Sequence, residues 1–310
     1  MYHYVRPEQT DLPYFRYLHL EDFSLQLDWL EENFGFISRD DFEHSLVDHQ
    51  PVEGAILTFD DGFSDHYHHV FPELVRRGLW GMFYVSTGVY ANRTLLDVHR
   101  IHVMIGCHGG AKVLETLTGL VEDHMLVDKD NVAFRTNTYR FQNNDDATNE
   151  AKRILNYYIS YEYRHGIMTS LFRRLMGGEE DTFGDFYLSL DQMREMSAAG
   201  MVIGSHSVSH PVFSKLDVNA QWAEIDGSFT FLERTLSTPV ETFCYPYGGF
   251  HNFTVETEHL LERRGCRFAF NVEPRDIDAR DLNEHPMALP RYDCNMFAYG
   301  LASQGANRPA

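Results

Sequence analysis

The chain has 310 residues, of which 43% are hydrophobic and 23% charged, as is typical of a folded globular protein. Its formal net charge of −20 argues against nucleic acid and anionic membranes as partners, because phosphate binding needs concentrated lysine and arginine. The sequence contains no run of about 18 apolar residues, so we predict no membrane insertion.

The N-terminus and the cysteines bear on the compartment. No basic leader followed by an apolar stretch is visible, so we expect a cytoplasmic protein without a signal peptide, although a chain trimmed of its leader would look the same. The four cysteines form no CxxC pair, and we expect reduced thiols at Cys107, Cys244, Cys266 and Cys294.

A first βαβ unit is predicted between residues 55 and 86. Ala55–Phe59 has the pattern of a short buried strand that ends at two acids. Residues 66–78 place apolar side chains at helical spacing, and Gly78 can end that helix. The apolar residues 81–86 form the next strand. Strand, helix and strand within about 30 residues require a parallel sheet.

The stretch from about Asp97 to Phe186 breaks this alternation. It has helical patterns at residues 111–121, 149–160 and 162–176, and it is too long for a connecting loop. We predict that residues 97–186 are a helical insertion after a barrel strand, placed to cap a site and select the substrate. A structural addition or a dimer surface is the alternative.

The alternation resumes near the C-terminal end. Ser189 can cap a helix through Ala199, with Gln192 in the capping-box position. Strands are predicted at residues 201–204, 242–245 and 266–271, and helices at about 219–236 and 254–264. Regular βα alternation at both ends predicts one barrel-like α/β domain over residues 1–310.

Two polar motifs follow predicted strands and form the candidate site. Asp60 and Asp61 come after the first strand, and His206 and His210 follow another about 145 residues later. Side chains just past strand ends are where α/β proteins place their chemistry. One carboxylate and two imidazoles suit zinc or another divalent first-row metal, which lowers the pKa of its water. The second acid can then remove the proton from that water.

Each motif alone has a simpler explanation. Paired aspartates before glycine often form a turn, and HxxxH is often one face of a helix. Two histidines and one carboxylate can also hold ferrous iron in an oxygenase, although the additional Asp60 argues against that reading.

The motifs Thr58–Gly62 (TFDDG) and His206–His210 (H-[ST]-x-x-H) resemble the first two motifs of the polysaccharide deacetylase family, the NodB-homology group of carbohydrate esterase family 4. Residues 243–248 match only the Pro-Tyr-Gly part of its third motif. The resemblance implies a distorted (β/α)7-type barrel, the NodB-homology fold, for the framework at both ends of the chain.

The same resemblance assigns roles by position. Asp60 corresponds to the general base, and Asp61, His206 and His210 correspond to the ligands of a divalent metal, with Zn²⁺ favoured over Co²⁺, Ni²⁺ or Fe²⁺. The backbone N–H of Tyr247 would stabilise the oxyanion, in a Pro-Tyr-Gly-Gly run whose turn chemistry can expose an N–H.

Two residues of the family pattern are missing at their usual positions, and other residues have to take their roles. The third-motif arginine that orients the base is missing near Tyr245, and Arg291 is our candidate, with a surface arginine as the alternative. The late histidine that protonates the leaving amine is also missing. Tyr2-His3 resembles the opening strand of permuted relatives such as the poly-N-acetylglucosamine deacetylases, so we assign His3 as general acid, unless it is a strand histidine without a role.

The implied reaction is hydrolysis of an N-acetyl or other N-acyl group on an amino sugar or glycan intermediate. The absence of a leader favours an intracellular substrate. Two other functions stay open: opening of cyclic amides, as in allantoinase, and glycan binding without turnover. The sequence does not decide whether the protein is a homo-oligomer.

Overall fold

The computed structural model describes residues 1–8, 11–140, 142–178 and 186–304. The chain forms two compact units. Unit 1 comprises residues 1–7, 17–92 and 185–302, and unit 2 comprises residues 8–16, 93–184 and 303–310. Each is described by itself.

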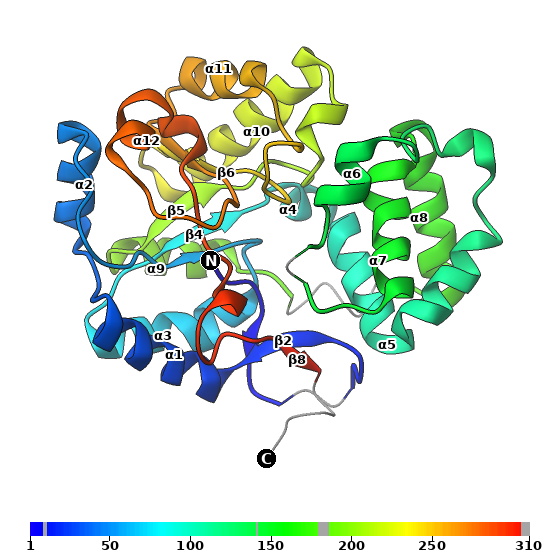
Figure 1. Ribbon diagram of the computed structural model, residues 1–310, viewed down its shortest axis with the longest axis horizontal. Helices are drawn as coiled ribbons and strands as arrows, with labels where there is room; N and C mark the ends of the chain where they lie inside the picture. The colour runs from blue at the N-terminus through cyan, green and yellow to red at the C-terminus, as the bar shows by residue number, and fades with distance from the viewer. Residues whose placement is uncertain (9–10, 141, 179–185, 305–310) are drawn as a thin grey trace. The chain divides into compact units, whose positions relative to one another are not determined.

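Unit 1 is built on a parallel sheet of five strands in the order β3-β4-β5-β6-β7 (Figure 1). Its strands are β3 (Thr58–Phe59), β4 (Met82–Val85), β5 (Val202–Ser205), β6 (Thr242–Cys244) and β7 (Phe268–Phe270). Nearly every strand residue is buried, as in sheets that helices cover on both faces, and this explains the short apolar runs in the sequence.

Single parallel bridges extend this sheet at both edges. Tyr2 lies beside Phe59 of β3, and Leu289 lies beside Phe270 of β7. The two outer segments also meet, because the N–H of Cys294 donates to the carbonyl of Met1 at 3.1 Å. The sheet is therefore curled into part of a barrel, and the predicted α/β NodB-type fold is confirmed.

Helices surround the sheet of unit 1, and α9 and α10 both pack on β5. The other elements of this unit are β1 (Val5–Arg6), β2 (Arg16–His19, with Arg16 in unit 2), α1 (Leu20–Asn33), α2 (Arg39–Asp48), η1 (His66–Val70), α3 (Phe71–Arg77), α4 (Gly88–Asn92), α9 (Leu190–Ala198), η4 (Phe213–Lys215), α10 (Val218–Leu236), α11 (Val255–Arg264), α12 (Ala279–Glu284), η5 (Pro286–Ala288) and η6 (Cys294–Met296).

Helix ends agree with the sequence signals. The predicted capping box of Ser189 and Gln192 is present at the start of α9. Gly78 and Gly265 end α3 and α11 in the left-handed conformation, with φ of 70° and 89°, as C-terminal glycines commonly do. The helix predicted over 66–78 is present, but its first turn is the π-helix η1 and not an α-helix. The strand predicted at 55–59 is shorter in the structure, because Ala55 bridges to Phe36 and only Thr58–Phe59 form β3.

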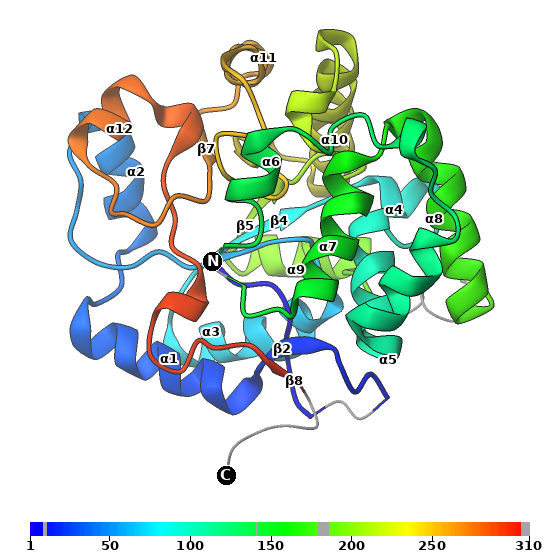
Figure 2. The same ribbon diagram turned by 45° about the vertical axis from the view of Figure 1, so that its right-hand side comes forward.

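Unit 2 is helical. Its elements are α5 (Asp97–Thr118), η2 (Asp123–Met125), α6 (Val132–Asn137), α7 (Asp146–Arg153), η3 (Ile154–Tyr158), α8 (Tyr161–Met176) and the short β8 (Ser303–Gln304). Helix α5 packs against α7 and α8 (Figure 2). Asp145 and Ser160 cap α7 and α8 with their side chains, so polar residues mark these starts as well. The part that residues 97–186 play as a cap stays a prediction.

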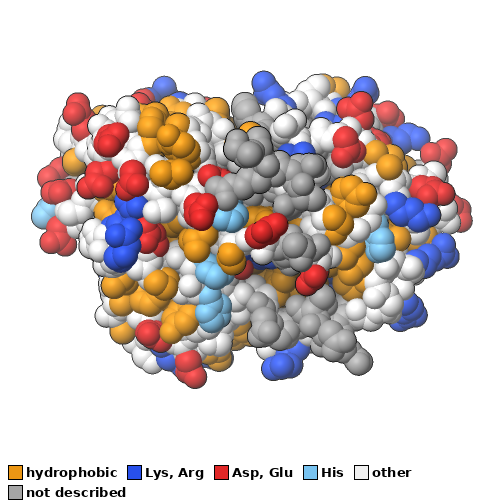
Figure 3. Space-filling model, turned by 90° about the horizontal axis from the view of Figure 1, so that it is seen from below, with side chains coloured by type: hydrophobic (Ala, Val, Ile, Leu, Met, Phe, Trp, Pro, Cys, Tyr) orange, Lys and Arg blue, Asp and Glu red, His pale blue; other side chains and the backbone are white. Residues whose placement is uncertain are grey.

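The charged surface, the helices and the cysteines can be compared with what the composition predicted. On the face shown in Figure 3, lysine and arginine side chains stand in small separate groups among acidic ones. None of the described helices has the length and apolarity that crossing a membrane requires. All four cysteines are free thiols, as predicted.

Candidate active site

The predicted site residues follow strands of the unit 1 sheet. Asp60 and Asp61 come directly after β3, and His206 comes directly after β5. The side chains of Asp60, Asp61 and His206 are all but inaccessible, at 2–4% exposure. Because parallel strands end on the same edge, chain segments far apart in the sequence bring these groups together.

Asp61 is the point where the two imidazoles converge. Its Oδ1 lies 3.5 Å from Nε2 of His206 and 3.4 Å from Nε2 of His210. Candidate ligand atoms of the three residues all lie within 4.8 Å of one another. One carboxylate oxygen and two imidazole nitrogens at this spacing form a donor set that suits a divalent metal and leaves positions for water and substrate.

The protonation of His206 is set by a carbonyl. Its Nδ1 lies 2.7 Å from the carbonyl oxygen of Cys244, which can only accept, so Nδ1 carries the proton and Nε2 keeps its lone pair toward Asp61. Burial lowers the pKa of His206, against the opposing influence of Asp60 and Asp61. The neutral imidazole that a metal ligand requires is therefore favoured.

Asp60 is held by Arg291. The guanidinium donates from Nη1 to Oδ1 and from Nη2 to Oδ2, both at 2.9 Å, and also from Nη1 to Thr58 Oγ1 at 2.9 Å. Burial alone would raise the pKa of Asp60, but Arg291 lowers it well below its usual range. Asp60 is thus a carboxylate fixed in position and ionised near neutral pH.

Cys244 forms a second candidate ligand group with Asp60 and His206. Arg291 Nη2 lies 2.9 Å from both Cys244 Sγ and Asp60 Oδ2, so a positive charge already occupies this side. Burial also raises the pKa of the Cys244 thiol well above its usual value, so it stays protonated. Of the two candidate groups, Asp61, His206 and His210 are therefore better suited to a cation.

His3 approaches the opposite oxygen of Asp61. Its Nε2 lies 4.0 Å from Asp61 Oδ2, and its side chain is 40% exposed. The segment that carries it is anchored on η1: His66 Nε2 donates to the His3 carbonyl at 2.9 Å, and Arg6 Nε donates to Asp65 Oδ2 at 2.7 Å. Burial lowers the pKa of His66 to about 4, which keeps this imidazole neutral.

Tyr247 lies in a turn of left-handed residues. Tyr247, Gly248 and Gly249 have φ of 66°, 61° and 82°. A Cβ on Gly248 would overlap the side chain of Val272, so only glycine fits there. Asn271 Oδ1 accepts from the N–H of Gly249 at 2.6 Å and fixes the turn. The ring of Tyr247 packs edge-on against His210, with ring centres 4.6 Å apart.

The backbone is strained where these side chains are presented. Asp61, Ser207, His210 and Tyr247 are non-glycine residues at φ of 80°, 68°, 57° and 66°. Such conformations persist where the surroundings over-determine them, and they concentrate at functional sites. The turn at Asp61-Gly62 also explains how two adjacent acids avoid pointing to opposite sides of a strand.

Three residues of this site were given no role by the sequence analysis, although Thr58 opens the first motif. Thr58 and Cys244 share Arg291 with Asp60, and His66 holds the His3 segment. These contacts join residues between 47 and 233 positions apart in the chain, so no local pattern reveals them.

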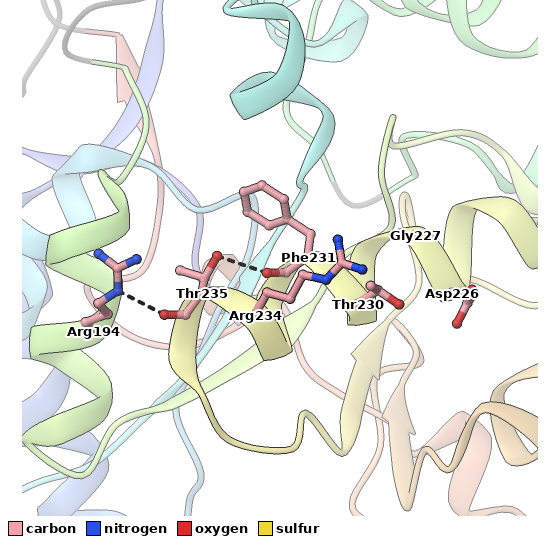
Figure 4. A pocket seen from close by; sticks show the side chains of 7 residues that line it. All are labelled: Arg194, Asp226, Gly227, Thr230, Phe231, Arg234 and Thr235. Atoms are coloured by element: carbon pink, nitrogen blue, oxygen red, sulfur yellow. Dashed lines mark hydrogen bonds between the residues drawn. The ribbon is translucent and has the colours of Figure 1, made fainter.

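A depression of about 540 Å³ lies elsewhere on unit 1 (Figure 4). It is lined by residues of α9 and α10, namely Arg194, Asp226, Gly227, Thr230, Phe231, Arg234 and Thr235. None of the predicted site residues lines it.

Comparison with known proteins identifies the family of this chain. The family model described as "Polysaccharide deacetylase" matches residues 48–266, more than half of the chain. The chain belongs to the polysaccharide deacetylase family. The match includes both motifs at the strand ends. No curated protein matches the sequence.

Solved structures share the fold. The Streptococcus pyogenes deacetylase PplD, solved in complex with acetate, is 17% identical, with 94% of this chain and 89% of that chain covered and a TM-score of 0.56. A de-N-acetylase from Aggregatibacter actinomycetemcomitans is 14% identical, with 94% and 92% covered and a TM-score of 0.52. The deacetylase domain of BpsB from Bordetella bronchiseptica is 14% identical, with 94% of both chains covered and a TM-score of 0.51. At these identities the likeness concerns the fold.

Proposed function

We propose that this protein is a divalent-metal-dependent hydrolase that removes an N-acetyl group from an amino sugar of a glycan or glycan intermediate. The convergence of Asp61, His206 and His210 beside the Asp60–Arg291 pair supports this proposal most directly. The family supports deacetylation of a polysaccharide, and this donor set supports dependence on a metal.

The residues present fit a metal. Asp61, His206 and His210 would hold a divalent cation, with zinc preferred for a carboxylate with two imidazoles and Co²⁺, Ni²⁺ or Fe²⁺ as alternatives. Such a cation supplies Lewis acidity, which lowers the pKa of water and polarises a carbonyl. The His206 hydrogen bond to Cys244 keeps one nitrogen available for it.

The side chains around this site divide the proton transfers. Asp60 would accept the proton of the attacking water, and Arg291 would hold its two oxygens in place during that transfer. The backbone N–H of Tyr247 would donate to the oxyanion of the tetrahedral intermediate, and one such donor is worth about 3 kcal/mol of barrier.

His3 would donate the proton that the leaving amine needs. Its side chain is 40% exposed and lies 4.0 Å from Asp61, where it can meet a substrate nitrogen. A histidine side chain can donate a proton and so serve as a general acid. Amines are poor leaving groups without a proton, so an amide hydrolase needs such a group.

The proposal is tested by acetate release. Protein stripped of metal and then reloaded with Zn²⁺ would be incubated with N-acetylglucosamine oligomers, monomers and sugar nucleotides. We expect acetate release only after reloading. Asp60→Asn loaded with the same metal is the negative control and should release none.

Other results would redirect the assignment. Metal-dependent opening of allantoin or another cyclic amide, without acetate release, would place the protein among ureide hydrolases. Zinc and glycan binding without any release would indicate a binding protein, and turnover that requires iron and oxygen would indicate an oxygenase.

A further inference from the structure

The loop between the two histidines has to hold an unfavourable backbone. It spans His206–His210 and contains Ser207 and His210 in the left-handed region, with φ of 68° and 57°. For non-glycine residues this conformation costs free energy and needs external support. If the loop relaxed, the two imidazoles could no longer share Asp61 Oδ1.

The carboxylate of Glu224, on α10, supports this loop by accepting hydrogen bonds from it. Its Oε2 accepts from the backbone N–H groups of Val208 and Ser209, both at 2.8 Å. Its Oε1 accepts from the hydroxyl of Ser209 at 2.6 Å. One carboxylate therefore makes three hydrogen bonds to two adjacent residues of the loop, and this geometry fixes both backbone N–H groups in place.

Helix α10 is shaped for this contact. Ser228, one helical turn after Glu224, places its hydroxyl 2.6 Å from that of Ser205, which in turn accepts from the N–H of Ser207 at 3.3 Å. Between these two positions, a Cβ on Gly227 would come within 3.1 Å of the Val208 side chain. Successive turns of one helix therefore contact the middle of the loop and Ser205, the strand residue just before it.

The opposite side of the loop is held by the backbone after β4. Thr87 N–H donates to the Ser207 carbonyl at 3.1 Å, and Gly88 N–H donates to the Val208 carbonyl at 2.8 Å. A Cβ on Gly88 would lie 2.8 Å from that carbonyl oxygen, so the approach requires glycine. The loop's carbonyls are thus bound from one side and its N–H groups from the other, by Glu224.

We propose that Glu224 is the positioning residue of the metal site. It holds the His206–His210 loop in the strained conformation that aims both Nε2 atoms at one cation, and it touches neither the cation nor the substrate. This inference rests on the ligand set of the proposed function. The effect is carried by the hydrogen-bond geometry of Glu224 and not by its negative charge.

Two substitutions separate geometry from charge. In Glu224→Gln the amide oxygen can accept from both backbone N–H groups, and the amide NH₂ can donate to the Ser209 hydroxyl, so the geometry is kept without the charge. In Glu224→Asp the charge is kept, but the shorter side chain can no longer reach the N–H groups of Val208 and Ser209. Glu233→Ala is the matched control, because Glu233 lies on the same helix and pairs with Arg264 at 2.8 Å, away from the loop.

The primary measurement is the Zn²⁺ dissociation constant, obtained by competition with a chromogenic chelator. Glu224→Ala and Glu224→Asp should bind Zn²⁺ on the order of 10–100-fold more weakly, the usual effect of losing a partner that orients ligands. Glu224→Gln and Glu233→Ala should stay within about threefold of the unaltered chain, because the loop's hydrogen bonds persist. Equal affinity across the series, or Gln as weak as Asp, would overturn the proposal.

Hydrogen exchange on metal-free protein gives a readout that needs no cation. The amides of Val208 and Ser209 should lose protection in Glu224→Asp and keep it in Glu224→Gln, while the β5 amides exchange alike in both. If Glu224→Ala does not fold, the Gln and Asp pair decides. An unaltered chain that binds no Zn²⁺ would refute the proposed metal site itself, whereas an unaltered chain that binds Zn²⁺ no better than Glu224→Asp would refute only the role of Glu224.

Discussion

Both units of the molecule bury charged side chains, but they arrange them differently. Unit 1 gathers carboxylates and imidazoles at its strand ends, and their lone pairs converge. Unit 2 buries cations instead: Asp97 bridges Arg100 and Arg164 at 3.1 Å and 2.6 Å, and Lys152 donates to Gln142 Oε1 at 2.7 Å, above the ring of Tyr139.

The two clusters differ in what their polar groups face. In unit 2 the buried cations of this cluster already face a carboxylate, an amide or an aromatic ring within the unit. In unit 1 one carboxylate and two imidazoles face one another, and a cation between them would satisfy all three groups. Among the described residues, both candidate ligand groups lie in unit 1. Burial of charge is therefore common to both units, and convergence of candidate metal ligands is what sets unit 1 apart.

The strongest test of this contrast is Asp61→Ala. Removing the carboxylate at the centre should abolish stoichiometric Zn²⁺ binding and reduce acetate release on the order of 10⁴-fold, since several kcal/mol of electrostatic stabilisation depends on the cation. Metal content by mass spectrometry and acetate release measure both. If Asp61→Ala still binds one Zn²⁺ tightly and Cys244→Ser does not, the cation uses the group of Asp60, His206 and Cys244 instead.

Asp60→Asn should separate catalysis from stability. Loss of the base is expected to lower turnover by about 10²–10⁴-fold. The unfolding free energy should also fall by about 3–5 kcal/mol, because Arg291 is left buried without its carboxylate. Adding Arg291→Met should restore much of that stability in urea unfolding without restoring turnover. Recovery of turnover in the double variant would remove Asp60 from the mechanism.

His3→Ala should discriminate between leaving groups. We expect hydrolysis of an N-acetyl amide to slow on the order of 10²-fold, because the amine needs a proton to leave. Hydrolysis of p-nitrophenyl acetate should change little, because its phenolate leaves without one, and Zn²⁺ affinity should be unchanged. His19→Ala, which removes only the cap of α1, is the control. An equal loss on amide and ester would show that His3 is not the acid.

Local patterns in the sequence predicted the framework of unit 1. Short apolar runs, Gly78, Gly265 and the Ser189 capping box each act within a few residues, so one stretch of sequence suffices to place them. The acids and histidines were identified in the same way, because each pair follows an apolar strand. Helices α1 and α2 were not predicted.

Contacts between distant segments could not be predicted from pattern. Glu224 follows His206 by a loop and two helical turns, and nothing in its neighbourhood indicates that its carboxylate binds backbone N–H groups. Arg291 was proposed only because the family resemblance required an arginine, and the structure shows it on Asp60. His66, in the π-helical turn η1, contacts the His3 carbonyl, and helical periodicity does not encode such a contact.

Lys152 gives the mildest test of the contrast. Burial, with Arg16 nearby, lowers its pKa to about 7 from about 10.5. Below pH 7 the amine is protonated in both states, whereas between pH 7 and about 10.5 only the unfolded chain keeps that proton. The unfolding free energy should therefore rise with pH across this interval, on the order of 4 kcal/mol, relative to Lys152→Met. Urea unfolding of both proteins at pH 6.5, 8 and 9.5 measures this difference. Contributions from other titrating groups cancel, because both proteins contain them.

Acetate release per folded molecule should be the same in Lys152→Met and the unaltered chain, because we expect the Lys152 cluster to be structural. A Lys152→Met variant that unfolds normally but loses turnover would show that the buried charge of unit 2 serves the reaction as well.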